Sequence, residues 1–207
     1  MSSASTQVAE PEKVTASQVS ISPPAAKSVE GVRREPMTRI RKRIAETLVT
    51  AQHTAAMLTT FNEVDMTAIF HIRKLYKEPF TEKYGISLGL MSFFVRAAVL
   101  ALQDYDAVNA SLDGDDVVYH DYVHMGIAVS TDRGLVVPVL KHVEQMSFAN
   151  IESEIKRVAF AARDGKLGIN DLGGGTFSIT NGGVFGSMLS TPIASSMRAT
   201  SASVWGM

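Results

Sequence analysis

The chain has 207 residues, of which 45% are hydrophobic and 20% charged, an ordinary composition for one large or two small globular domains. Twenty Lys and Arg against 21 Asp and Glu give a net charge of −1, which excludes a whole-chain basic field for nucleic acid. The absence of cysteine excludes a disulfide scaffold, a thiolate zinc site and a cysteine nucleophile. The longest apolar stretch, 86–102, is interrupted by Ser92 and Arg96. We therefore expect no membrane span, no secretory signal and a soluble intracellular protein.

Residues 1–35 differ in composition from the rest of the chain. They contain seven serines, three prolines and no aromatic residue, and their four acidic and four basic side chains cancel. Such a segment cannot bury enough apolar area to offset its chain entropy. We predict a disordered linker over 1–35 and a folded domain from Pro36 onward.

The first predicted helix covers 37–56, with Thr38 as its N-cap. Its apolar residues recur at helical spacing: Ile40, Ile44, Leu48 and Ala51. Its first half is basic, with Arg39, Arg41, Lys42 and Arg43. Positive charge is unfavourable at a helix N-terminus, so this run is either a solvated face or a site for an anion.

A strand is predicted over 58–65, and Asp65 or Thr67 would cap a helix running through Tyr76. The residues expected to face inward on that helix are Ile69, Ile72 and Leu75. Residues 88–103 form a strongly apolar segment, which predicts a helix buried on most sides.

The segment 104–121 has six Asp and no Lys or Arg. Within it, two short apolar runs, 108–112 and 117–119, flank Asp113-Gly114-Asp115-Asp116. This pattern predicts a β-hairpin.

Two further strands are predicted over 123–129 and 135–140, and their continuous apolar character indicates a sheet covered on both faces. Pro138 favours an edge or a bulge in the second of them. Ser147 is expected to cap a helix reaching about Arg163, which Gly165 ends.

Gly173-Gly174-Gly175 precedes a predicted strand over 176–180, and Asn181-Gly182-Gly183 predicts a turn after it. The triglycine lacks phosphate-loop spacing, so a tight entry into the strand explains it equally well. Residues 194–207 show neither helical nor strand periodicity and have the composition of a tail. The whole pattern predicts an α/β (α+β) fold in which helices flank a mixed sheet.

The five histidines show no metal-ligand spacing, which favours surface or strand-end positions. They are His53, His71, His120, His124 and His142. A Ser-His-Asp set is compatible with the composition, but no G-x-S-x-G motif supports one. No metal site is predicted.

Four segments occur in one order: MTRIRKRIAETL, MLTTFNEVDM, AVSTDRGLVVPVL and GGGTFSITNGGVFGSMLSTPI. Together they resemble the catalytic domain of the dihydrolipoamide acyltransferases of 2-oxo acid dehydrogenase complexes, over about 36–193. The NGGVFGS wording is more similar to the succinyltransferase branch than to the acetyltransferase branch. The resemblance implies a chloramphenicol acetyltransferase-like fold, incomplete at its C-terminus, and an aberrant tail over 194–207.

The resemblance also implies a reaction, the transfer of a succinyl group from a lipoyl arm to coenzyme A. In the family, a histidine in a D-H-R-x-x-D-G motif takes the proton of the attacking thiol, and a Ser or Thr hydroxyl stabilises the oxyanion. By motif position that hydroxyl is Thr180. The motif with the histidine does not occur in these 207 residues, so we expect this chain by itself to be inactive, as a truncated form would be.

Three arginines are carried over as candidates for the coenzyme A phosphates: Arg96, Arg39 and Arg43. Arg96 has the stronger case, because a charge inside an apolar helix needs a partner. For Arg39 and Arg43 a solvated surface is an equal alternative.

The resemblance implies a homotrimer within a larger core, with 2-oxoglutarate dehydrogenase and dihydrolipoamide dehydrogenase components as partners. The lipoyl group would come from another domain or chain. The compartment would be the bacterial cytoplasm, or the mitochondrial matrix in a eukaryote. The alternatives are a non-catalytic scaffold subunit and a decayed fragment of the same family.

Overall fold

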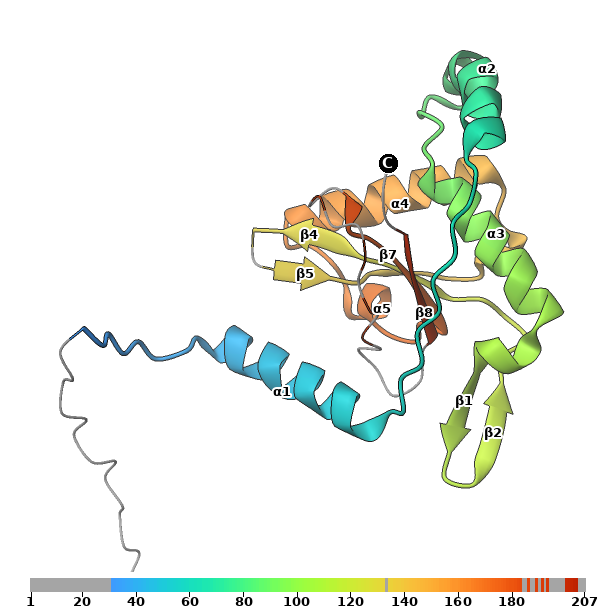
Figure 1. The fold of residues 1–207 in the computed structure, drawn as a ribbon. Coiled ribbons are helices and arrows are strands. Elements are labelled where there is room, and N and C mark those ends of the chain that lie inside the picture. The colour runs from blue at the N-terminus through green and yellow to red at the C-terminus, as the bar shows by residue number, and fades with distance from the viewer. Residues whose placement is uncertain are drawn as a thin grey trace, which may run out of the picture. The chain divides into compact units, whose positions relative to one another are not determined.

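A computed structural model describes residues 31–132, 134–183, 186, 189, 191, 193 and 200–204, the last range by its backbone. Contacts divide the chain into two units, Met1–Met37 and Thr38–Met207. Most of the predicted linker and most of 184–199 therefore lie outside the described residues. The helices and strands of the described residues all belong to the second unit (Figure 1).

The first two helices are exposed. Helix α1 spans Arg39–Thr54, and the Thr38 hydroxyl oxygen accepts from the Arg41 N–H at 3.3 Å, as predicted for an N-cap. Helix α2 spans Thr67–Tyr84 and has no buried residue. In α1 only Ala51 is buried. Of the three residues predicted to face inward on α2, Ile72 and Leu75 are exposed and Ile69 is half-buried.

The strand predicted over 58–65 is wrong, because these residues belong to no strand and pair with none of the strands in the described part of the chain. Leu58 is 89% exposed and Val64 74% exposed. Alternation of residue types favours an extended backbone, but a strand also needs a neighbour to accept its hydrogen bonds.

Helices α3 (Met91–Asp104) and α4 (Phe148–Arg163) pack against each other. The Ser147 hydroxyl oxygen accepts from the Asn150 N–H at 3.2 Å, and Gly165 adopts a φ of +69° beyond the end of α4. Both ends of α4 therefore agree with the prediction. A short helix that the sequence analysis did not predict, α5, follows at Ile169–Leu172.

The central sheet has four strands in the order β6-β3-β7-β8. They span Val139–Leu140 (β6), Met125–Ile127 (β3), Phe177–Asn181 (β7) and Thr200–Val204 (β8). Strand β3 is antiparallel to β6 and parallel to β7, and β7 is parallel to β8. The sheet is therefore mixed and flanked by helices, which confirms the predicted α/β class.

The two strands predicted over 123–129 and 135–140 are each split. Strands β4 (Val129–Thr131) and β5 (Gly134–Val136) form an antiparallel pair of their own. Pro138 lies between β5 and β6, and β6 is at the edge of the central sheet. The proline thus lies in the break between two strands, next to the edge of the sheet, where its lack of an N–H removes no hydrogen bond between strands.

The segment 194–207, in which we expected no regular element, contains β8. Its backbone pairs in parallel with all of β7, from Phe177↔Thr200 to Asn181↔Val204. Periodicity could not reveal this strand, because pairing along an open sheet edge is made by main-chain groups, whatever the side chains are.

The predicted hairpin is confirmed as β1 (Ala110–Asp113) and β2 (Asp116–Tyr119). All four β2 residues are exposed. A one-turn 3-10 helix, η1 (Asp106–Asn109), leads into it, and a second, η2 (Val143–Gln145), precedes α4.

The core lies between α3, α4 and the central sheet. Its buried members come from these elements and from η2 and the residues before β3: Val95, Val99, Leu102, Val123, Met125, Ile127, Leu140, Val143, Ile151, Val158, Phe177 and Ile179.

Candidate functional site

Thr180 is the penultimate residue of β7 and is half-buried. Strand β7 lies between β3 and β8; Thr180 follows Ile179, the last β7 residue that pairs with β3, and its register partner on β8 is Ser203. The chain then turns as predicted, because the Asn181 side-chain oxygen accepts from the Gly183 N–H at 3.0 Å. Thr180 therefore stands at the carboxyl end of a central strand, immediately before a tight turn.

Arg96 lies on α3 and is half-buried. Its Nη1 donates to the Glu144 backbone oxygen of η2 at 3.3 Å, which supplies the partner that a charge in an apolar helix needs. Arg39 and Arg43 lie one turn apart on α1 and are exposed, and Arg43 pairs with Glu46 at 3.6 Å. The predicted site residues thus come from three elements, β7, α3 and α1.

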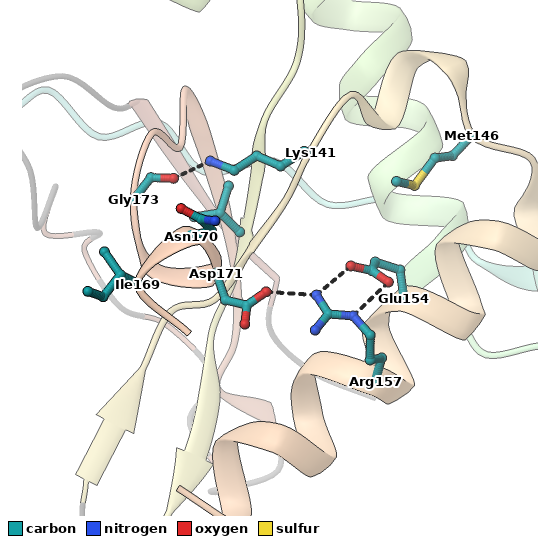
Figure 2. A pocket seen from close by; sticks show the side chains of 9 residues that line it. Lys141, Met146, Glu154, Arg157, Ile169, Asn170, Asp171 and Gly173 are labelled. Carbon is teal, nitrogen blue, oxygen red and sulfur yellow. Dashed lines mark hydrogen bonds and ion pairs between the residues drawn. The ribbon is translucent and has the colours of Figure 1, made fainter. Parts of the chain in front are cut away.

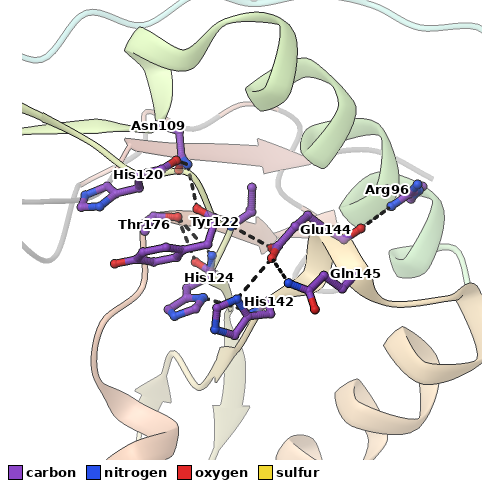
Figure 3. A network of polar contacts seen from close by, with 10 residues as sticks. Arg96, Asn109, His120, Tyr122, His124, His142, Glu144, Gln145 and Thr176 are labelled. Atoms are coloured by element: carbon purple, nitrogen blue, oxygen red, sulfur yellow. Dashed lines mark hydrogen bonds and ion pairs between the residues drawn. The ribbon is translucent and has the colours of Figure 1, made fainter.

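The tertiary structure also builds an aromatic cluster of Tyr122, His124 and His142 (Figure 3). The rings of Tyr122 and His124 are 4.3 Å apart, and those of His124 and His142 meet edge-on at 4.6 Å. The backbone N–H of His142 donates to His124 Nδ1 at 3.1 Å, and His142 has a φ of +54°. Residue spacing does not predict this cluster, because 18 residues separate the two histidines in the chain.

Glu144 closes the cluster on the side of η2 (Figure 3). Its Oε2 accepts from the Val123 N–H at 2.9 Å, and its Oε1 lies 3.2 Å from His142 Nδ1. Burial raises the pKa of the Glu144 carboxyl, but the N–H groups and His142 outweigh it and hold that pKa below its usual value. Burial, followed by the charges of Lys141 and His142, lowers the pKa of His124.

Asn109 and Thr176 connect this cluster to the fold. The buried Asn109 amide donates to the backbone oxygens of His120 and Tyr122, both at 2.9 Å. The Thr176 hydroxyl oxygen accepts from the His124 N–H at 3.2 Å. The segment leading into β3 is therefore held from two sides, and its aromatic rings are presented in one orientation.

A pocket of about 600 Å³ lies between α4, α5 and β6 (Figure 2). Its charges neutralise one another: Arg157 contacts Glu154 at 2.6 Å and Asp171 at 2.8 Å. The hydrogen bond from Arg157, then the one from the Gly168 N–H, hold the pKa of Asp171 below its usual value. Salt bridges therefore join α4 to α5 along one wall of the pocket.

The triglycine at 173–175 borders the same pocket. The Lys141 ammonium donates to the Gly173 oxygen, and Gly174 has a φ of +75°. A Cβ at Gly175 would lie 3.3 Å from a Val139 methyl carbon. Both observations support the tight strand entry, because the backbone must turn and approach β6 closely.

In the described part of the chain, no group of three or more His, Cys, Asp or Glu is placed to hold a metal ion. No helix in that part of the chain is long and apolar enough to cross a membrane.

Comparison with known proteins gives a consistent set of matches. The model of the 2-oxoacid dehydrogenase acyltransferase catalytic domain matches residues 29–200. The chain is 59% identical over 161 residues to the dihydrolipoyllysine-residue succinyltransferase component of the 2-oxoglutarate dehydrogenase complex of Escherichia coli K12, covering 78% of this chain and 40% of that relative. A component of the same name from Haemophilus influenzae is 58% identical over 168 residues, which are 81% of this chain and 41% of that protein. The chain thus spans about two fifths of the length of these curated relatives.

Solved structures are similar as well. The dihydrolipoamide acetyltransferase of Azotobacter vinelandii, whose catalytic mechanism was studied at a serine, a histidine and an asparagine, matches with a TM-score of 0.76 and 30% identity, over 84% of this chain and 74% of that one. The cubic core of the pyruvate dehydrogenase multienzyme complex matches with a TM-score of 0.76 and 29% identity over the same shares.

Proposed function

Since the chain belongs to the family of 2-oxoacid dehydrogenase acyltransferase catalytic domains, we propose that it serves the transfer of a succinyl group from a lipoyl arm to coenzyme A in a 2-oxoglutarate dehydrogenase complex. The observation that carries this proposal is the 59% identity over 161 residues to a relative named for that activity. The absence of cysteine is compatible with it, because both thiols belong to the substrates.

Thr180 has the role of stabilising the tetrahedral oxyanion. Its support is its place at the end of β7, half-buried and followed by the Asn181 turn, where a substrate carbonyl could approach past glycines. A hydroxyl that donates to a developing oxyanion contributes about 10²–10³ in rate.

The thiol proton needs a separate base. A thiol with a pKa near ~8.5 is only a few per cent ionised at neutral pH, and an imidazole base contributes roughly 10²–10⁴-fold. The D-H-R-x-x-D-G motif is not among these 207 residues. We therefore expect them, taken alone, to lack family-like activity.

Coenzyme A phosphates are the proposed ligands of Arg96, Arg39 and Arg43. Arg96 Nη1 donates a hydrogen bond to the Glu144 backbone oxygen. Because a guanidinium has five N–H donors, the same side chain can also contact a phosphate. Arg39 and Arg43 share one side of α1 at (i, i+4) spacing and are exposed, which suits contact with an anion.

The proposed assembly is a homotrimer within a multienzyme core, with 2-oxoglutarate dehydrogenase and dihydrolipoamide dehydrogenase components as partners and the lipoyl group on another domain or chain. Residues 1–35 would be the linker of this layout, and the compartment would be the bacterial cytoplasm or the mitochondrial matrix. The match to a cubic core supports the assembly. The second candidate function is that of a non-catalytic subunit of the same core.

The test is coenzyme A-dependent succinyl transfer from succinyl-dihydrolipoamide. The 207-residue chain is compared with a chimera in which residues from 194 onward are replaced by a complete family C-terminus. We expect transfer only by the chimera, and Thr180→Ala in the chimera lowers kcat about 10²-fold with KM little changed. Thr180→Ser, which keeps the hydroxyl, is the matched control.

Equal rates of the chain and the chimera would mean that residues 36–193 contain a base. An unchanged kcat in Thr180→Ala would remove Thr180 from the mechanism. A chimera that assembles but transfers no succinyl group would leave the scaffold as the function.

A further inference from the structure

Glu144 is an acidic side chain that the proposed reaction does not use. Only 12% of its side chain is exposed, and acidic groups are rarely buried unless their oxygens have partners. Both oxygens have one: Oε2 accepts from the Val123 N–H at 2.9 Å, and Oε1 lies 3.2 Å from His142 Nδ1. The carboxylate is therefore built into the fold, and its contacts show which segments it joins.

These contacts fasten η2 to the segment that leads into β3. The backbone oxygen of Val123 accepts from the Val143 N–H at 3.0 Å, and the Val123 N–H donates to the Glu144 carboxylate. Both backbone groups of Val123 are thus bonded to η2. His142, the residue before η2, has a φ of +54°, and a residue other than glycine keeps such a conformation only where its surroundings fix it. Glu144 contributes to that fixation.

The 3-10 helix η2 in turn holds Arg96 (Figure 3). The Arg96 Nη1 on α3 donates to the Glu144 backbone oxygen at 3.3 Å, so the place of the guanidinium depends on the place of η2. A free arginine side chain has many rotamers, and binding a ligand to it costs the entropy of selecting one of them. A side chain that an acceptor already holds loses less entropy on binding. The Glu144 carboxylate is therefore linked to Arg96 through the backbone of η2.

We propose that Glu144 is a positioning residue for coenzyme A. Its carboxylate fixes η2, and the backbone oxygen of Glu144 holds the Arg96 guanidinium ready for a phosphate of coenzyme A. A guanidinium has further N–H donors for that phosphate. The inference rests on the coenzyme A role proposed above for Arg96 and names a residue on which that role depends.

The sign of the effect distinguishes positioning from charge. A carboxylate near an anion site repels the anion, so by charge alone the loss of Glu144 would strengthen the binding of coenzyme A. Positioning has the opposite sign, because η2 loses its hydrogen bond from the Val123 N–H and the acceptor of Arg96 shifts with it. A weaker affinity after the loss of a negative charge is therefore specific to positioning.

The test measures coenzyme A affinity by isothermal titration calorimetry, in the 207-residue chain and in the chimera with a complete family C-terminus. We expect Arg96→Ala to raise Kd about 10-fold, through the loss of a charge-assisted hydrogen bond. Glu144→Ala should raise Kd about 3–10-fold. Glu144→Gln keeps an oxygen that can accept from the Val123 N–H, and its Kd should lie within about 2-fold of the parent value.

A double-mutant cycle shows whether Glu144 acts through Arg96. In the Arg96→Ala background, Glu144→Ala should have no further effect on Kd, because the side chain that Glu144 positions is absent. In the chimera, Glu144→Ala should raise KM for coenzyme A and leave kcat little changed. The kcat/KM for pantetheine, which carries the thiol but no phosphate, should not change.

Glu152 provides the matched control. On α4, its Oε1 accepts from the Gly89 N–H at 2.9 Å, the same kind of bond as that between Glu144 and Val123. Glu152→Ala and Glu144→Ala should both lower the urea midpoint, because each leaves a backbone N–H without its acceptor. Only Glu144→Ala should weaken coenzyme A binding, so a loss of fold stability does not give the same pattern.

Positioning is supported if Glu144→Ala weakens binding only when Arg96 is present and Glu144→Gln restores it. Tighter or unchanged binding in Glu144→Ala overturns it, and so does a weakening that persists without Arg96 or in Glu144→Gln. An unchanged Kd in Arg96→Ala, or no binding of coenzyme A by chain and chimera, overturns the role of Arg96 as well. Succinyl transfer by the chimera is assayed separately, so its failure with binding intact overturns the proposed reaction and leaves the role of Glu144 standing.

Discussion

Helices α3 and α2 follow one another in the chain, yet one is buried and the other is not. Helix α3 contributes Val95, Val99 and Leu102 to the core, with Val95 and Val99 fully buried. Helix α2 has no buried residue, and Leu75 on it is 60% exposed. Both have apolar residues at helical spacing. The comparison shows that this spacing predicts a helix and a preferred face, while the surface that covers the face has to be supplied by the rest of the fold or by a partner.

The largest difference between the two regions is expected in side-chain truncation. Ile151→Ala on α4, the helix that packs against α3, removes a fully buried side chain from the core that the two helices share. It should lower the free energy of unfolding by about 2–5 kcal/mol. Leu75→Ala on α2 is the matched control and should change it by less than about 0.5 kcal/mol. Urea unfolding followed by circular dichroism measures both. Equal losses would mean that α2 is covered in solution.

The next effect concerns the polar junction between the hairpin and the core. Asn109→Ala removes the amide that donates to the His120 and Tyr122 oxygens at 2.9 Å. Leaving these two part-buried carbonyls without the amide donor should cost about 1–3 kcal/mol. Asn150→Ala on exposed α4 surface is the control. Hydrogen exchange should show faster exchange in 110–119 for the Asn109 variant, and unchanged exchange there would contradict the role of this amide.

A smaller change in stability is expected from pH, through His124 beside the core. Burial and then the charges of Lys141 and His142 lower the pKa of His124 from 6.5, so between the lowered value and 6.5 the unfolded chain binds more protons than the folded one. Stability therefore rises with pH in that window and falls on acidification. The urea midpoint should drop between about pH 7.5 and about pH 5.5. His124→Gln should flatten this slope, and an equally steep slope in the variant would assign the effect to other groups.

The smallest effect on stability is expected on the exposed side of the β1–β2 hairpin. Leu112→Ser changes a side chain that is 70% exposed, and under conditions where the chain is monomeric it should alter the free energy of unfolding by less than about 0.5 kcal/mol. Val99→Ser, fully buried on α3, is the contrasting control and should destabilise strongly. A large loss for Leu112→Ser in the monomer would show that the hairpin is packed against its own chain.

The sequence by itself determined the local elements that have a chemical start and stop. Ser147 and Gly165 bound α4, Asp113 to Asp116 form the hairpin turn, and the Thr38 cap begins α1. The four ordered motifs also led to the family, which the comparisons show. These features are readable because capping, turn formation and motif order depend on neighbours in the chain.

Only the tertiary structure decided what those elements contact. It left 58–65 without a partner strand, gave β7 a parallel partner at Thr200–Val204 and brought His142 to His124 across 18 residues. The Glu144 backbone oxygen that accepts a hydrogen bond from Arg96 belongs to η2, 48 residues away in the chain. Each of these contacts joins segments that are far apart in sequence. The free energy that selects them comes from packing and backbone pairing in the folded state, and the spacing of residues along the chain does not predict it.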